Sequence, residues 1–191
     1  MTGLGDYALF PQGLAISLII GIAACGPFGR LLGTRRVIAW AIVASFGVIL
    51  SATLTPSREA LEHGAAGAAS CDFSRIGPAP FADLLSVNDT SLNVLLFVPL
   101  GVAVGLVPRS RRKAALLAGV LALPFAIETI QLLATPLGRA CQSADVVDNL
   151  SGLLLGLLLG LLLGWIAGSI AGGLRRRPVA GSHPNGSSRP R

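Results

Sequence analysis

Charged residues are scarce in this chain: they make up 13% of its 191 residues, while hydrophobic residues make up 52%. Average soluble domains carry about 25% charged residues, so an ordinary soluble protein is excluded and one integral membrane domain is predicted. Histidine is also rare. The chain has two, His63 and His183, and both lie outside the apolar runs. No spacing matches a Ser-His-Asp triad, a metal site or a phosphate-binding glycine loop. We therefore expect no cofactor and no metal.

Five apolar runs can cross about 30 Å of hydrocarbon at about 1.5 Å per residue. They cover residues 9–29, 37–54, 92–107, 114–134 and 150–171. The sequence therefore predicts an all-α, polytopic bundle of about five transmembrane helices. The segment Ile22–Cys25 looks like a lipoprotein cleavage site. Because no basic residue precedes the first run, we expect that run to remain as a helix.

Basic residues are distributed unevenly between these runs. Twelve of the fifteen lie in the gaps 30–36 and 109–113 or in the tail 175–191, and none of the nine acidic residues does. By the positive-inside rule these three regions are cytoplasmic. We expect the N-terminus outside, the C-terminus inside, an external loop at 55–91, and a transmembrane domain at 1–174. The disordered basic tail predicts contact with the lipid bilayer and not with nucleic acid, since no folded basic module accompanies it.

Polar side chains are predicted to gather at the outer ends of the last three runs. Glu128 lies deep in the fourth run, and Gln131, three residues later, shares its helix face. Arg139 is the natural counter-charge for Glu128 or Asp145. Such groups are costly in a membrane and mark functional sites, although a cluster that only locks the helices together is the alternative. The members of this polar cluster are Asp89, Asn93, Glu128, Gln131, Arg139, Asp145 and Asn149.

Two of the three cysteines, Cys71 and Cys141, are predicted on the outer face, where disulfides persist. A bridge between them would tie the 55–91 loop to the 135–148 loop, close to the polar cluster. Two unrelated thiols are the alternative.

Glycine recurs at every fourth position of the last run. Such a spacing forms a shallow groove that another helix can approach closely. We expect packing against another span of the same chain, with a homodimer or a functional cavity as the alternatives. The glycines are Gly152, Gly156, Gly160, Gly164, Gly168 and Gly172.

The region 89–165 resembles the VanZ-like family of bacterial membrane proteins. The first half of the pattern is DTSLNVLLFVPLG, starting at Asp89; the second is ETIQ, starting at Glu128, followed by GRACQSADVVDNLSG, ending at Gly152. The resemblance implies a multi-pass protein of the bacterial plasma membrane, in a family whose founding member is associated with teicoplanin resistance. It implies no established reaction. Cys141 and Asp148 are not positions of the family pattern.

Two functions fit these observations. The first is a non-enzymatic envelope protein that binds a lipid-linked or cell-wall ligand, or a glycopeptide antibiotic, at the polar cluster. The second is an intramembrane hydrolase or transferase on a lipid-linked substrate, with Glu128 and Asp145 as general acid and base and Arg139 stabilising an anionic oxygen. The lack of histidine in the helices favours the first. A proton-coupled transporter is a third alternative, although no inverted repeat is visible.

Overall fold

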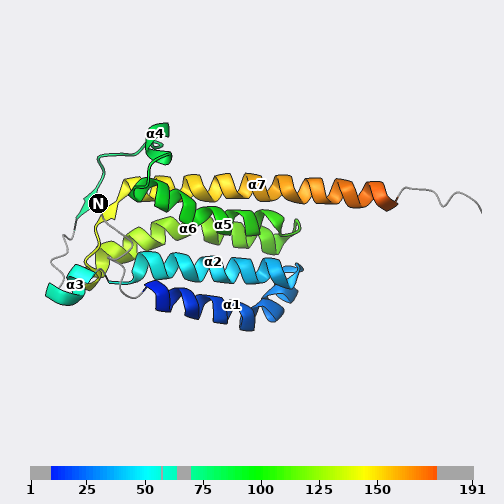
Figure 1. Cartoon of the computed structure of the whole chain (residues 1–191), viewed down its shortest axis with the longest axis horizontal. Helices are drawn as coiled ribbons and strands as arrows, with labels where there is room; N and C mark the ends of the chain where they lie inside the picture. The colour runs from blue at the N-terminus through cyan, green and yellow to red at the C-terminus, as the bar shows by residue number, and fades with distance from the viewer. Residues whose placement is uncertain (1–9, 57, 64–69, 176–191) are drawn as a thin grey trace, which may run out of the picture.

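Five long helices form an up-and-down bundle, as the sequence predicts (Figure 1). The computed structural model describes residues 10–56, 58–63 and 70–175. All five helices are long and apolar enough to cross a membrane. They are α1 (Phe10–Leu32), α2 (Arg36–Leu54), α5 (Asp89–Leu106), α6 (Arg111–Leu133) and α7 (Ser143–Arg175). The predicted cytoplasmic tail lies outside the described residues from residue 176 onward, and the sidedness of the two termini stays a prediction.

The helices α5, α6 and α7 begin before the apolar runs that predict them. Asn88 caps α5: its side chain accepts the Ser91 N–H at 2.9 Å, while the Ser91 hydroxyl accepts the Asn88 N–H at 3.2 Å. This reciprocal capping box satisfies backbone donors that the first turn leaves open. Ser110 caps α6 in a similar way. Hydropathy misses these ends because capping residues are polar. α7 likewise begins at Ser143, before the predicted run 150–171.

The turns joining α1 to α2 and α5 to α6 lie together at one end of the bundle (Figure 1). Gly33 adopts φ 65° in the first turn, a left-handed conformation that glycine enters without steric cost. In the second turn, Lys113 Nζ donates to the carbonyl oxygens of Gly105 at 2.9 Å and Val107 at 2.7 Å. These bonds satisfy carbonyls that the end of α5 leaves without helical partners.

The hydrophobic core is centred on α5, which packs against α2 and α7. Phe97, Leu100 and Val104 of α5 are fully buried, together with Ile49 of α2 and Ile127 of α6. α1 packs against α2 on the outside of the bundle.

Glycines bring α5 and α7 into backbone contact. A Cβ added at any of three α7 glycines would come within 3.0 Å of an α5 backbone atom, and Gly101 and Gly105 of α5 face α7 in the same way. These three are Gly152, Gly156 and Gly160. By contrast, Gly164 faces only the Leu106 side chain at 3.8 Å, and Gly168 has open space around it. Intramolecular packing therefore uses the first half of the repeat, and a homodimer through this helix stays a prediction.

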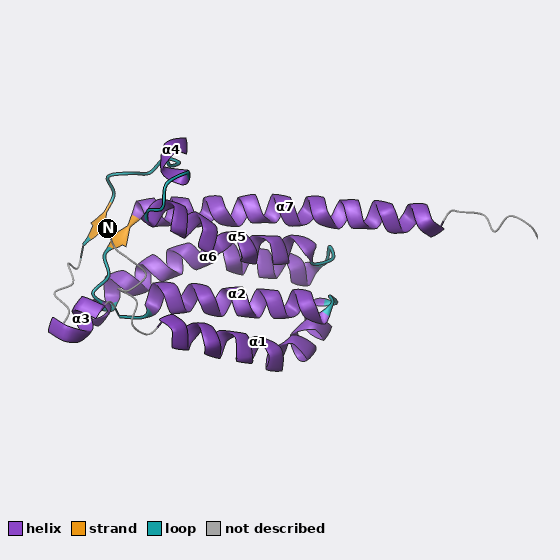
Figure 2. Ribbon diagram, viewed as in Figure 1, coloured by secondary structure: helices purple, strands orange, loops and turns teal. Residues whose placement is uncertain are grey.

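The segment between α2 and α5 contains structure of its own, at the end of the bundle opposite the short turns (Figure 2). It includes α3 (Arg58–His63), β1 (Cys71–Asp72) and α4 (Phe81–Leu84). After α6, a short 3-10 helix (Thr135–Leu137) leads to β2 (Cys141–Gln142), which pairs in parallel with β1. The predicted disulfide between Cys71 and Cys141 is present, with a Cα–Cα distance of 4.5 Å. It fixes the long loop to the segment that leads into α7.

Candidate functional site

Six of the seven predicted cluster residues line one cavity of about 390 Å³ near the disulfide end of the bundle. The seventh, Asp89, is the first residue of α5, one turn before Asn93, and is not among the lining residues. The polar lining is Thr53, Asn93, Glu128, Gln131, Arg139, Asp145 and Asn149. The apolar lining is Phe10, Val48, Ala52, Leu92, Leu95, Leu96 and Pro99.

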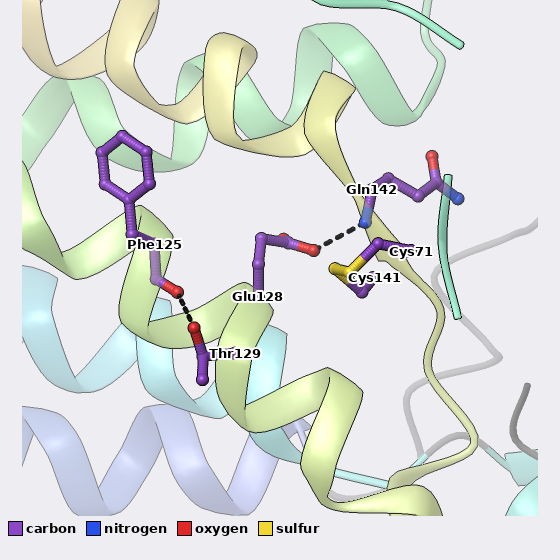
Figure 3. The surroundings of a disulfide bond; sticks show 6 residues. All are labelled: Cys71, Phe125, Glu128, Thr129, Cys141 and Gln142. Carbon is purple, nitrogen blue, oxygen red and sulfur yellow. Dashed lines mark hydrogen bonds between the residues drawn. A yellow bond between two sulfur atoms is a disulfide. The ribbon is translucent and has the colours of Figure 1, made fainter. Parts of the chain in front are cut away.

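Glu128 is held at the cavity by the strand that carries the disulfide. It is 5% exposed, and its Oε2 accepts the backbone N–H of Gln142 at 2.8 Å. Figure 3 shows Glu128 pointing from α6 toward β2, beside the Cys71–Cys141 bridge. A backbone donor fixed in this way orients the carboxyl group without adding a charge of its own. Strand β2 therefore carries both a disulfide cysteine, Cys141, and the N–H group of Gln142 that orients Glu128 at the cavity.

Two side-chain hydrogen bonds connect the helices around the cavity. Asn93 Nδ2 donates to Asp145 Oδ1 at 2.8 Å, which joins α5 to α7. Gln131 Nε2 donates to the Thr53 carbonyl at 2.9 Å, which joins α6 to α2. Both bonds join residues far apart in sequence, so the cluster connects helices; whether it also binds a ligand stays a prediction.

The Arg139 side chain donates to the backbone at the end of α2, and its role as counter-charge for Glu128 or Asp145 stays a prediction. Its Nη2 donates to the carbonyl oxygens of Ala52 at 2.9 Å and Thr55 at 3.5 Å, at the end of α2. These bonds satisfy carbonyls that a helix end leaves without intrahelical partners. Arg139 still lines the cavity, but the bonds that hold Glu128 and Asp145 come from Gln142 and Asn93.

Sequence reasoning missed an ion pair between Arg75 and Asp148. Their Nη2 and Oδ2 atoms are 2.5 Å apart, and the side chains are 27% and 2% exposed. The Asp148 carboxylate raises the pKa of Arg75 above its ordinary value, chiefly through this hydrogen bond. Ser143 Oγ also donates to the Arg75 carbonyl at 2.7 Å. The signal was present in the sequence, because Arg75 is one of only three basic residues placed outside by the predicted threading.

The site offers carboxyl, amide and guanidinium groups. Among the described residues, no three His, Cys, Asp or Glu side chains are placed to hold a metal ion. Glu128 and Asp145 come from different helices and meet at one cavity. Such an arrangement can bind a polar group, and two carboxyl groups in one pocket can also exchange protons with a substrate.

Comparison with known families gives one match. The family model described as VanZ/LLP1 matches residues 42–164, which is more than half of the chain and includes α5, α6 and the polar part of α7. No curated protein and no solved structure matches. With five apolar helices and this match, the chain is a multi-pass membrane protein that belongs to the VanZ/LLP1 family.

Proposed function

We propose that this protein binds an amphipathic ligand of the cell envelope, with the polar head group in the cavity and an apolar chain against the outside of the bundle. A lipid-linked or cell-wall-related molecule, or a glycopeptide antibiotic, has this character. The observation that carries the proposal is the composition of the cavity: six polar cluster residues line it together with seven apolar residues. Ligand sites commonly combine an apolar lining with a few placed polar groups.

The apolar wall supports access from the lipid. Leu92 and Leu95 of α5 line the cavity, yet they are 43% and 62% exposed. Val48 and Ala52 of α2 also line it. A side chain that borders a cavity and is exposed on the outer surface marks an opening. We infer that an acyl chain enters between α2 and α5.

The proposed location of the cavity is the outer leaflet of a bacterial plasma membrane. The short turns at the opposite end lie beside most of the basic gap residues, which the positive-inside rule assigns to the cytoplasm. The disulfide favours the same orientation, because disulfides persist outside the cytosol. Labelling of single cysteines placed at Gly33 and Ala134 with a membrane-impermeant maleimide tests it. Labelling of position 33 in intact cells would contradict this orientation.

An intramembrane hydrolase or transferase is the second candidate. It is favoured by the presence of two carboxyl groups, Glu128 and Asp145, at the same cavity. Different surroundings that push two carboxyl pKa values apart suit one group to act as acid and the other as base. Such an enzyme should lose turnover in Glu128→Gln, whereas a binding protein keeps part of its function.

The test is teicoplanin susceptibility of a strain that lacks the protein and is complemented with wild type or Glu128→Gln, with vancomycin as comparator. Glutamine retains an oxygen that can accept the Gln142 N–H, so the fold should be kept. Thr129→Val is the matched control, because Thr129 is exposed and bonds only to the Phe125 carbonyl of its own helix (Figure 3).

Wild type and Thr129→Val should raise teicoplanin tolerance, and Glu128→Gln at equal membrane abundance should do so less. Equal tolerance in all strains, including the one without the protein, would remove the antibiotic from the proposal. A loss with Glu128→Gln that is matched by loss of folded protein would make the residue structural.

A further inference from the structure

Several hydrogen-bond donors at the cavity are already bonded to the protein. Two of its amide groups donate to the protein: Gln131 Nε2 binds the Thr53 carbonyl, and Asn93 Nδ2 binds Asp145. The Arg139 guanidinium donates to carbonyl oxygens of α2.

Two residues that line the cavity each have a buried side-chain carbonyl oxygen with no hydrogen-bond partner among the described residues. The oxygens are Gln131 Oε1 and Asn149 Oδ1; the two residues are 6% and 2% exposed. The orientation of the Gln131 amide is fixed, because only its nitrogen can donate to the Thr53 carbonyl. Buried polar groups are nearly always paired, so an unpaired acceptor beside a cavity indicates a missing donor.

The charges at the cavity favour the same kind of ligand. Two carboxyl groups, from Glu128 and Asp145, line it together with one guanidinium, from Arg139. An ammonium group has three donors and no acceptor, so it matches a site with excess carbonyl and carboxyl oxygens. A hydroxyl group brings an acceptor as well as a donor, and matches it less well.

Resting on the binding function proposed above, we infer that the ligand is a membrane lipid whose head group carries a primary ammonium. Its N–H groups donate to Gln131 Oε1 and Asn149 Oδ1, with the carboxyl groups of Glu128 and Asp145 nearby. The acyl chains leave the cavity past Leu92 and Leu95. In this proposal the two unpaired carbonyl oxygens select the ligand and do not contribute to helix packing.

The experiment measures lipid binding to the purified full-length chain by native mass spectrometry. The probes are phosphatidylethanolamine, phosphatidylcholine and phosphatidic acid with identical acyl chains. The first two carry the same charges and differ in three N-methyl groups, which replace the N–H donors of the head group and enlarge it. Phosphoethanolamine, the head group without chains, is added as a competitor to separate a lipid ligand from a soluble amine.

We expect phosphatidylethanolamine to bind about tenfold more tightly than phosphatidylcholine, equivalent to about 1.4 kcal/mol. Phosphatidic acid should bind no better than phosphatidylcholine, and phosphoethanolamine should not compete. Equal binding of the ethanolamine and choline lipids, or a preference for phosphatidic acid, would overturn the ammonium assignment and leave a lipid-binding function standing. Competition by phosphoethanolamine would replace the lipid by a soluble amine. No binding of any lipid would remove the proposed function itself.

Asn149→Leu supplies a second readout. Leucine is similar in size and has no polar atom, so the variant removes an unpaired buried acceptor. We expect its ligand-free form to melt at the same temperature as wild type or higher, while the preference for ethanolamine falls to near onefold. Thr129→Val is the control and should keep the preference. A variant that melts lower and retains the preference would show that Asn149 serves the fold instead.

Discussion

The contact between α5 and α7 predicts a strong asymmetry within the glycine repeat of α7. Gly156 and Gly168 are separated by three helical turns and carry the same residue type in similar sequence. A Cβ at Gly156 would overlap backbone atoms of Val98 and Val102, whereas a Cβ at Gly168 would meet nothing within 4 Å. Backbone atoms cannot escape by a change of rotamer. Gly156→Ala therefore requires α5 and α7 to move apart, and Gly168→Ala does not.

Two effects of opposite sign set the change in the free energy of unfolding of Gly156→Ala. Overpacking a well-packed interior costs about 1–3 kcal/mol, and the upper part of that range applies because the obstacle is backbone. Replacing a helical glycine by alanine gains about 1 kcal/mol in helix propensity, and this gain is common to both variants. We expect Gly156→Ala to lose about 1–2 kcal/mol relative to wild type, from the difference of these two effects. Gly168→Ala should be neutral or gain up to about 1 kcal/mol.

Thermal unfolding of the purified full-length protein in detergent checks this prediction. In a chain of this size, each kcal/mol moves Tm by about 2–4 °C, so the two variants should differ by about 5 °C or more. If the melting temperatures of Gly156→Ala and Gly168→Ala agree within about 1 °C, the close approach of α5 and α7 is refuted. A large loss in Gly168→Ala alone would instead indicate that the far half of the repeat packs against a second copy.

The remaining predictions concern the two tethers of the long loop. Cys71→Ser opens a cross-link between residues 70 positions apart, and should lower the free energy of unfolding by up to about 4 kcal/mol on the chain-entropy model; Cys25→Ser, at the free cysteine, should change nothing. Equal melting of the two serine variants would contradict a stabilising disulfide. Arg75→Met leaves the Asp148 carboxylate buried without its guanidinium, so stability should fall by about 3 kcal/mol, the low end for a broken buried pair because Arg75 is partly exposed. Adding Asp148→Asn should recover much of that loss, and a double variant as unstable as the sum of the two single ones would rule out direct coupling.

Hydropathy alone predicted the number of helices and their approximate bounds. The reason is physical: a segment that spans hydrocarbon must be apolar for its whole length, so its signal is local. The missing helix ends, such as the start of α5, depend on capping by Asn88 and Ser91, which hydropathy does not record. The helices within the long loop likewise gave no apolar signal.

The sequence predicted which residues belong to the candidate site, but not which hydrogen bonds they make. Unusual polar residues in apolar helices, such as Glu128 and Gln131, are visible in any sequence because a membrane makes them costly. Their partners are not visible, since each bond crosses between helices. Only the fold could place the Gln142 N–H on Glu128.

The sequence by itself determined that this is a multi-pass helical protein with a polar cluster near one end of its helices, because both properties depend on local composition. Tertiary structure decided that Arg75 pairs with Asp148 and that Arg139 caps α2. It also decided that two residues lining the cavity each bury a carbonyl oxygen without a partner among the described residues. These results depend on how helices meet in three dimensions. Sequence spacing restricts such contacts only within one helix, where residues three or four apart share a face.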